Sequence, residues 1–213
     1  MAKTECSSII IGKNVSKTGK IIAGHNEDNR GLLVMPQYYF PRQKHNKEEY
    51  IKFEKESASI PQVLETYGFY WSETRSPEGS SFADGFINEN GVAVFSDGCY
   101  ASKEENPDLK DGGIGYGLRR LVAERAKSAR DGINIATSLL DEYGYNDSGR
   151  SYQIVDKDEA WVLQVVYGKN YVARRVKDDE VVFIPNRFTI HEIDFNDLSL
   201  IHISEPTRLL SIS

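Results

Sequence analysis

Short runs of apolar, often β-branched residues recur along the chain and predict strands. Residues 9–11 and 21–23 are two such runs, and the stretch between them is polar and contains a glycine, which predicts a hairpin. Residues 86–87 and 92–95 form a second pair around Asn90-Gly91. Asn-Gly between apolar runs is a strong signal for a tight hairpin turn.

The second half of the chain changes from a helical to a strand-like period. Apolar residues at helical spacing predict two successive amphipathic helices. The first is marked by Leu118, Leu121, Val122, Ala126 and Ala129, and the second by Ile133, Ala136, Leu139, Leu140 and Tyr143. Four apolar runs with short polar breaks follow, which predicts an antiparallel meander; they cover residues 152–155, 160–166, 171–176 and 181–184.

Strands, then a helix pair, then strands are the element order of an α+β layer architecture. The charged segment 44–59 predicts an exposed excursion or a helix between core elements. With 213 residues the chain is long enough for one sizeable core.

Composition narrows the function classes. The net charge is −6 and the pI about 5.3, which argues against nucleic acid as a partner. Apolar runs stay far below the roughly 20 residues of a membrane-spanning helix, and a basic-then-apolar leader is missing. We therefore expect a soluble, cytoplasmic protein without a membrane partner, in which Cys6 and Cys99 are free thiols.

Cys6 is the main candidate for chemistry because it immediately precedes an apolar strand. If the bond between Glu5 and Cys6 were cut, one residue would carry a thiol and a free α-amine. That amine titrates near pH ~8 and can act as the base for its own thiol. The alternative is a small buried residue in a strand, a common place for a free cysteine.

The hairpin predicted for residues 9–23 returns a polar cluster toward Cys6. The cluster is Gly24-His25-Asn26-Glu27-Asp28-Asn29. A histidine and carboxylates are the neighbours that set the reactivity of a thiol. The alternative is a solvated loop after a strand.

These residues carry a resemblance to a known family. Thr4-Glu5-Cys6-Ser7-Ser8 and Gly24-His25-Asn26-Glu27-Asp28 resemble the start of the PepD-type cysteine dipeptidases, which belong to the N-terminal-nucleophile hydrolase superfamily. Further segments follow in the family's order, so the resemblance covers Cys6 to about Ile193. They are residues 82–94, 113–126, 158–161, 174–180 and Pro185-Asn186.

The resemblance implies an αββα sandwich of two antiparallel sheets with helices outside, incomplete here at its C-terminus. It also implies amide hydrolysis through a thioester on Cys6, after removal of residues 1–5 as a short propeptide. Asp28 matches the acidic residue of the family pattern and is assigned to holding the α-amine, and Asn186 to stabilising the oxyanion. His25 and Asp97 are assigned to substrate binding.

Each assignment has a structural alternative. Asp28 is otherwise an exposed loop carboxylate, and Asn186 and Asp97 otherwise serve turns. His25 departs from the family, whose members often have arginine there, and histidine donates to a substrate carboxylate only when protonated. The sequence also indicates that Asn88 serves the hairpin turn and that Cys99 is a packing residue.

Neither a metal nor another cofactor is expected. The four histidines, of which His25 is one, show no ligand spacing. Gly112-Gly113-Ile114-Gly115 opens a helix, but a Lys-Ser/Thr pair does not follow it, so a phosphate loop is poorly supported. The expected partner is a small peptide substrate, and the sequence leaves homo-oligomerisation open.

We expect the last residues to lie outside the family's pattern. Residues 198–208 agree with the in-frame translation of a transposase-type sequencing adapter. We therefore interpret residues 6–197 as the N-terminal part of a single hydrolase domain and residues 198–213 as an adapter artefact. Apolar residues in such a tail are expected to pack poorly or to lie exposed; they include Leu198, Leu200, Ile201 and Ile203.

Three functions compete at this point. The first is a dipeptidase that cuts short peptides, and the second is another amide hydrolase of the superfamily, similar to an acylase. The third is a non-catalytic interaction protein that retains the fold. Retention of Cys6 and Asp28 favours an enzyme, and the five residues before Cys6 favour a processed precursor.

Overall fold

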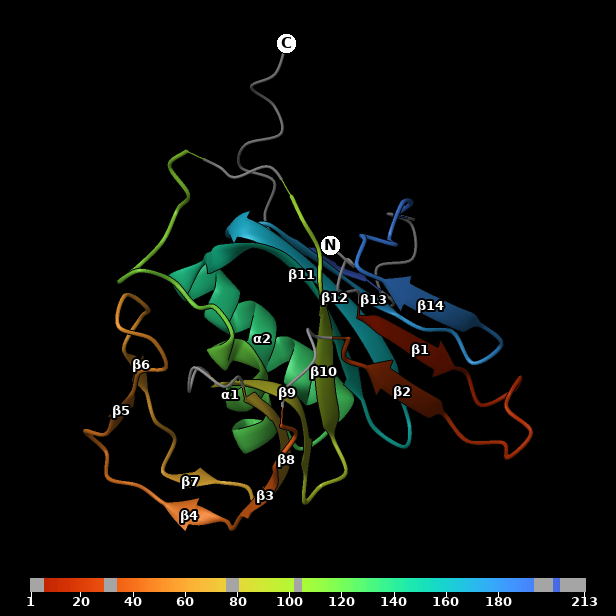
Figure 1. Cartoon of the computed structure of the whole chain (residues 1–213), viewed down its shortest axis with the longest axis horizontal. Helices are drawn as coiled ribbons and strands as arrows, with labels where there is room; N and C mark the ends of the chain where they lie inside the picture. The colour runs from red at the N-terminus through yellow and green to blue at the C-terminus, as the bar shows by residue number, and fades with distance from the viewer. Residues whose placement is uncertain (1–5, 29–33, 76–80, 102–104, 194–200, 204–213) are drawn as a thin grey trace.

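A computed structural model describes residues 6–28, 34–75, 81–101, 105–193 and 201–203. Its elements form three layers (Figure 1): two helices, a large antiparallel sheet, and a small antiparallel sheet on the other face. The α+β class expected from the sequence is confirmed.

The helices are α1 (Gly117–Arg125) and α2 (Ala129–Tyr143), in agreement with the two predicted from periodicity. The small sheet has the order β14-β1-β2, and the large one β15-β13-β12-β11-β10-β9-β8-β3. The strands of the small sheet are β1 (Ser7–Ile11), β2 (Ile22–Asn26) and β14 (Val181–Pro185). Those of the large sheet are β3 (Gln37–Phe40), β8 (Phe69–Arg75), β9 (Ser81–Asn88), β10 (Ala93–Gly98), β11 (Tyr145–Val155), β12 (Ala160–Gly168), β13 (Tyr171–Arg175) and β15 (Ile201–Ile203).

Both predicted hairpins are present. β1 pairs with β2, and β9 pairs with β10. In the second hairpin the side-chain oxygen of Asn88 accepts hydrogen bonds from the backbone N–H groups of Asn90 and Val92. Its amide donates to the carbonyls of Ala123 and Ala126 at the end of α1. Asn88 therefore serves the turn, as predicted, and also ties the turn to the helix layer.

The predicted four-stranded meander is only partly correct. β11, β12 and β13 are consecutive antiparallel neighbours, but β14 leaves their sheet and pairs with β1, where Ile9 faces Phe183. Local sequence pattern cannot distinguish these partners, because a short turn permits either a hairpin or a change of sheet. The change matters because it brings Pro185 opposite Ser7, next to Cys6.

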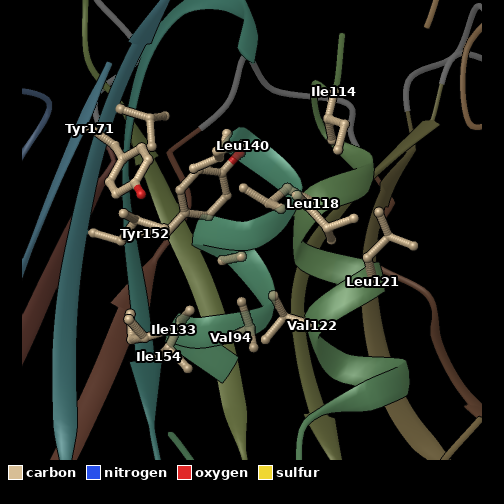
Figure 2. Close-up of a cluster of buried hydrophobic side chains, with 14 of the residues drawn as sticks. Val94, Ile114, Leu118, Leu121, Val122, Ile133, Leu140, Tyr152, Ile154 and Tyr171 are labelled. Atoms are coloured by element: carbon tan, nitrogen blue, oxygen red, sulfur yellow. The ribbon is translucent and has the colours of Figure 1, made fainter. Parts of the chain in front are cut away.

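The helices cover one face of the large sheet. Side chains from α1 and α2 meet those of β10 and β11 in an apolar cluster (Figure 2), in which Leu121, Ile133 and Ile154 are almost completely buried. Alternate residues of the same strands point the other way, toward the small sheet, as the period of two requires. Ile10, Phe95, Val162 and Ile184 form the apolar part of that second interior.

The interior between the two sheets changes character along the strands. At one end it is apolar, and at the other it is lined by buried polar side chains at the same alternating positions. They are Ser8 on β1, Asp97 on β10, Ser151 and Gln153 on β11, and Gln164 on β12. Buried polar groups need hydrogen-bond partners, so this polar end of the interior is the candidate functional site.

Two segments bear on other expectations. The excursion at residues 44–59 is not a helix but belongs to two short ribbons, in which β4 (Gln43–Lys44) pairs with β7 (Glu65–Thr66) and β5 (Tyr50–Ile51) with β6 (Ile60–Pro61). In the C-terminal tail, β15 pairs with β13, which counts against a wholly unpaired tail. Leu198 and Leu200 lie outside the described residues, and the origin of the tail stays a prediction.

The close approach of α2 to the sheet yields a first test. Gly132 lies in the helix interior, where alanine would gain about 1 kcal/mol of helix propensity. However, a β-carbon there would meet the Ile154 side chain at 2.8 Å and that of Val122 at 3.1 Å. Overpacking of this kind costs about 1–3 kcal/mol. Gly132→Ala should therefore lower the free energy of unfolding by about 1 kcal/mol in urea titrations.

Asn134→Ala is the matched control, because Asn134 is exposed on the same helix. It should stabilise the protein by about 0.5 kcal/mol through helix propensity alone. A Gly132→Ala protein that is as stable as the Asn134→Ala protein would contradict the close packing of α2 on β11.

Candidate active site

Cys6 lies directly before β1, at the polar end of the interior between the sheets. Because Ser7 pairs with Asn26, the antiparallel register places Glu27 opposite Cys6. The Glu27 side chain, the Asp28 backbone and the Asn186 side chain act on the pKa of the Cys6 thiol through hydrogen bonds. The first two follow β2 and the third follows β14, so all three strands of the small sheet converge on the thiol.

Burial and charge hold the Cys6 thiol in its protonated form. Burial raises the pKa of Cys6, the Glu27 carboxylate raises it further, and the pKa reaches about 11. Hydrogen bonds from the Asp28 backbone and the Asn186 side chain act in the opposite direction. These two donors stabilise negative charge at the sulfur, but they do not outweigh burial.

Ser8 connects the two sheets behind the thiol. Its hydroxyl donates to Asp97 Oδ2 across 2.6 Å and lies 2.9 Å from His25 Nδ1. Gln153 Oε1 is 3.3 Å from the same hydroxyl. Ser8 comes from β1, His25 from β2, Asp97 from β10 and Gln153 from β11, so this contact ties four strands together.

His25 continues the network toward the thiol. Its Nε2 lies 3.3 Å from Glu27 Oε2, and its ring stacks on Phe95 with the ring centroids 5.6 Å apart. The imidazole is therefore fixed between a carboxylate on each side, because Asp97 Oδ1 lies 3.7 Å from Nδ1. A continuous chain of polar groups leads from Asp97 through Ser8 and His25 to Glu27 and Cys6.

Asp97 is completely buried, and its Oδ1 has no hydrogen-bond partner. Burial raises the pKa of Asp97 from 3.8 to about 6, against the lowering effects of the Ser8 hydroxyl and of His25. The Asp97 carboxyl group therefore loses its proton at a higher pH than an ordinary aspartate does.

Two further residues complete the surroundings. Asn186 donates from Nδ2 to the Gly98 carbonyl across 2.8 Å, and its buried Oδ1 has no hydrogen-bond partner. Cys99 is buried, and its thiol lies 3.7 Å from the Asp97 carbonyl oxygen. Burial raises the pKa of Cys99 to about 12, which is consistent with the packing role expected for it.

The structure brings together four of the five residues selected from the sequence, namely Cys6, His25, Asp97 and Asn186. The fifth, Asp28, is exposed and contacts the thiol through its backbone. The Glu27 carboxylate, to which the sequence gives no individual role, acts directly on the thiol.

Ser8 and Gln153 were also missed. Both are polar residues at inward positions of apolar strands, and this pattern is the signal that would have identified them. Such a position is either solvated or hydrogen-bonded in the core, and the structure shows the second case.

The described residues contain no cluster of three or more potential metal ligands. Among the same residues, neither helix has the length and hydropathy needed to cross a membrane.

The Glu27 carboxylate generates a test of the thiol environment. Glu27→Gln removes a negative charge beside the sulfur, so the pKa of Cys6 should fall from about 11. The rate of alkylation by iodoacetamide, followed against pH, should then rise at lower pH than in the wild-type chain. Glu142→Gln changes an exposed carboxylate on α2 and should leave the profile unchanged. An unchanged profile for Glu27→Gln would show that this carboxylate does not face the thiol.

Asp97 generates a test of stability against pH. Its pKa is higher in the folded protein than the unfolded value of 3.8. Such a group favours folding below the unfolded pKa, and this contribution is lost as the pH rises through the folded pKa. Because one pKa unit corresponds to about 1.4 kcal/mol, the stability of wild type relative to Asp97→Asn should fall by about 3 kcal/mol between pH ~3 and pH ~7. Urea titrations at both ends measure it, and a constant difference would contradict the burial of an ionisable group.

Comparison with curated proteins finds dipeptidases. The chain is 30% identical over 202 residues to a probable dipeptidase of Latilactobacillus sakei, an alignment that covers 90% of this chain and 41% of the relative. It is 28% identical over 208 residues to dipeptidase A of Lactobacillus helveticus, covering 92% and 43%. The chain thus spans about two fifths of the length of these relatives.

Among solved structures, a variant of conjugated bile acid hydrolase from Clostridium perfringens superposes with a TM-score of 0.50. The sequences are 12% identical, and the superposition covers 83% of this chain and 52% of the other. This likeness concerns the fold alone, which is the N-terminal-nucleophile hydrolase fold expected from the sequence.

A protein-family model matches almost the whole chain. The model described as Peptidase family C69 matches residues 5–209, which include Cys6 and every residue of the polar network around it. The chain therefore belongs to peptidase family C69.

Proposed function

We propose that the intact protein is a cysteine dipeptidase whose nucleophile is Cys6. The observation that carries the proposal is the convergence of three strands on this thiol, with a carboxylate and two hydrogen-bond donors around the sulfur. Membership of a peptidase family and likeness to dipeptidases support the same reaction class.

In the proposed reaction, cleavage between Glu5 and Cys6 first exposes the α-amine of Cys6. Residues 1–5 lie outside the described residues, so this maturation rests on the sequence. The amine accepts the thiol proton while the sulfur attacks the peptide carbonyl carbon, and the ammonium then protonates the departing amine. Water hydrolyses the resulting thioester and regenerates the thiol.

The two donors at the sulfur are suited to stabilise the tetrahedral intermediate. The Asp28 backbone N–H and the Asn186 side chain both contact Cys6, so an oxygen on the attacked carbon forms close to them. Hydrogen-bond donors that are fixed before reaction stabilise such an oxyanion by a few kcal/mol each. Within this proposal the Asp28 carboxylate holds the α-amine, and His25 and Asp97 shape the substrate side of the site.

The nucleophile can be tested directly on the full-length mature protein. Cys6→Ala should abolish dipeptide hydrolysis, because the attacking atom is lost, whereas Cys99→Ala should retain most of the activity. Hydrolysis of a panel of dipeptides, followed by release of free amino acids, measures both. N-terminal analysis of the same sample determines whether the active form begins at Cys6.

Several outcomes would change the proposal. Loss of activity in Cys99→Ala but not in Cys6→Ala would show that Cys6 is not the nucleophile. An active enzyme that still carries Glu5 would exclude the α-amine as base. Conjugated bile acids and penicillin V belong in the same panel. Hydrolysis of these without hydrolysis of dipeptides would favour the acylase alternative.

A further inference from the structure

Both ring nitrogens of His25 face oxygen atoms. Nδ1 lies 2.9 Å from the Ser8 hydroxyl, and Nε2 lies 3.3 Å from Glu27 Oε2. The His25 side chain is 8% exposed, so the ring is largely shielded from solvent. The protonation state of the ring follows from which of these atoms can donate.

The Ser8 hydroxyl has a single proton. The shortest of its contacts is with Asp97 Oδ2 at 2.6 Å, and an ionised carboxylate can only accept. Ser8 therefore donates to Asp97, and its oxygen is left to accept from His25 Nδ1. On the other side of the ring, the ionised Glu27 carboxylate also accepts. A histidine donates from both nitrogens only as the imidazolium cation.

The charged and titratable groups around the ring support this state. Asp97 on β10 and Glu27 after β2 both face it, with Asp97 Oδ1 3.7 Å from Nδ1. Of the other strands, β1 contributes the neutral Ser8 and β11 the neutral Gln153. The Arg150 cation on β11 acts on Asp97. At longer range its positive charge disfavours a protonated His25 ring.

We propose that His25 is a positively charged positioning residue, anchored by Asp97 through Ser8, that fixes and neutralises the Glu27 carboxylate beside Cys6. The stack on Phe95 holds the ring in the required plane. This inference deepens the proposed function, on which it rests only for its catalytic consequence. The negative charge of Glu27 opposite the thiol hinders formation of a thiolate, and the imidazolium offsets part of that charge.

The protonation state is measured first, in the wild-type chain. At pH ~7.5 a histidine of ordinary pKa, about 6.5, is mostly neutral. In ¹⁵N NMR spectra, with His25→Gln to assign the signals, both His25 ring nitrogens should carry protons at this pH. His45, whose Nδ1 lies 2.8 Å from Glu49 Oε1, provides a second histidine signal in the same spectrum for comparison. The spectrum of a neutral ring at His25 would overturn the proposal.

The coupling to Glu27 is measured by alkylation of Cys6 with iodoacetamide at pH ~8.5. His25→Gln should slow alkylation by about tenfold, which corresponds to about one pKa unit of the thiol. His25→Arg keeps a fixed positive charge and should stay within about twofold of wild type. In a Glu27→Gln background, His25→Gln should have almost no effect, because His25 acts through that carboxylate.

Equal slowing by His25→Gln in both backgrounds would overturn the proposal, as would a His25→Arg protein as slow as His25→Gln. Neither readout depends on peptidase activity. A chain that shows the expected NMR and alkylation results but cleaves no dipeptide would refute the proposed function and leave this inference standing. If a variant fails to fold, which circular dichroism reveals, the wild-type NMR measurement still decides.

Discussion

The hydrogen bond between Ser8 and Asp97 is the contact on which the arrangement of the site depends. It joins β1 of the small sheet to β10 of the large one through a carboxylate that is completely buried. An ionised group in such a place is costly unless it is hydrogen-bonded and paired. The two sheets are therefore held in the one alignment that places a hydroxyl and an imidazole over Asp97. A slip of one residue in β1 would turn Ser8 outward and leave the carboxylate without its donor.

Side chains of β1 alternate between its two faces, and the three that point to the interior have different roles. Ile10 anchors β1 in the apolar interior, and Ser8 two residues earlier bonds to Asp97. Cys6, two residues earlier again, points the same way, at the edge where β2 and β14 also end. The nucleophile is thus positioned by the packing of residues behind it. This is why a thiol at the very start of a strand can have a defined set of partners.

Most of the local structure could be predicted from the sequence, and the pairing between distant strands could not. The Asn90-Gly91 turn and the helices α1 and α2 follow from short-range pattern. The pairing of β14 with β1 depends on which sheet offers an unpaired edge, and the sequence of β14 does not encode that choice. The distinction between Glu27 and Asp28 depends on register, because adjacent residues after a strand point in opposite directions. The role of the Asp28 carboxylate at the α-amine stays a prediction.

The raised pKa of Cys6 fits a nucleophile that works only after processing. With a pKa of about 11, roughly one thiol in ten thousand is ionised at neutral pH, so the Cys6 thiol is almost entirely protonated. Burial and the Glu27 carboxylate both act in this direction. In the proposed mechanism the α-amine, which titrates near pH ~8, appears on the same residue at the moment of cleavage. Within that mechanism the Glu27 carboxylate, which disfavours the thiolate, lies beside the residue that carries the new amine, so the charge that opposes ionisation of the thiol favours a protonated amine next to it.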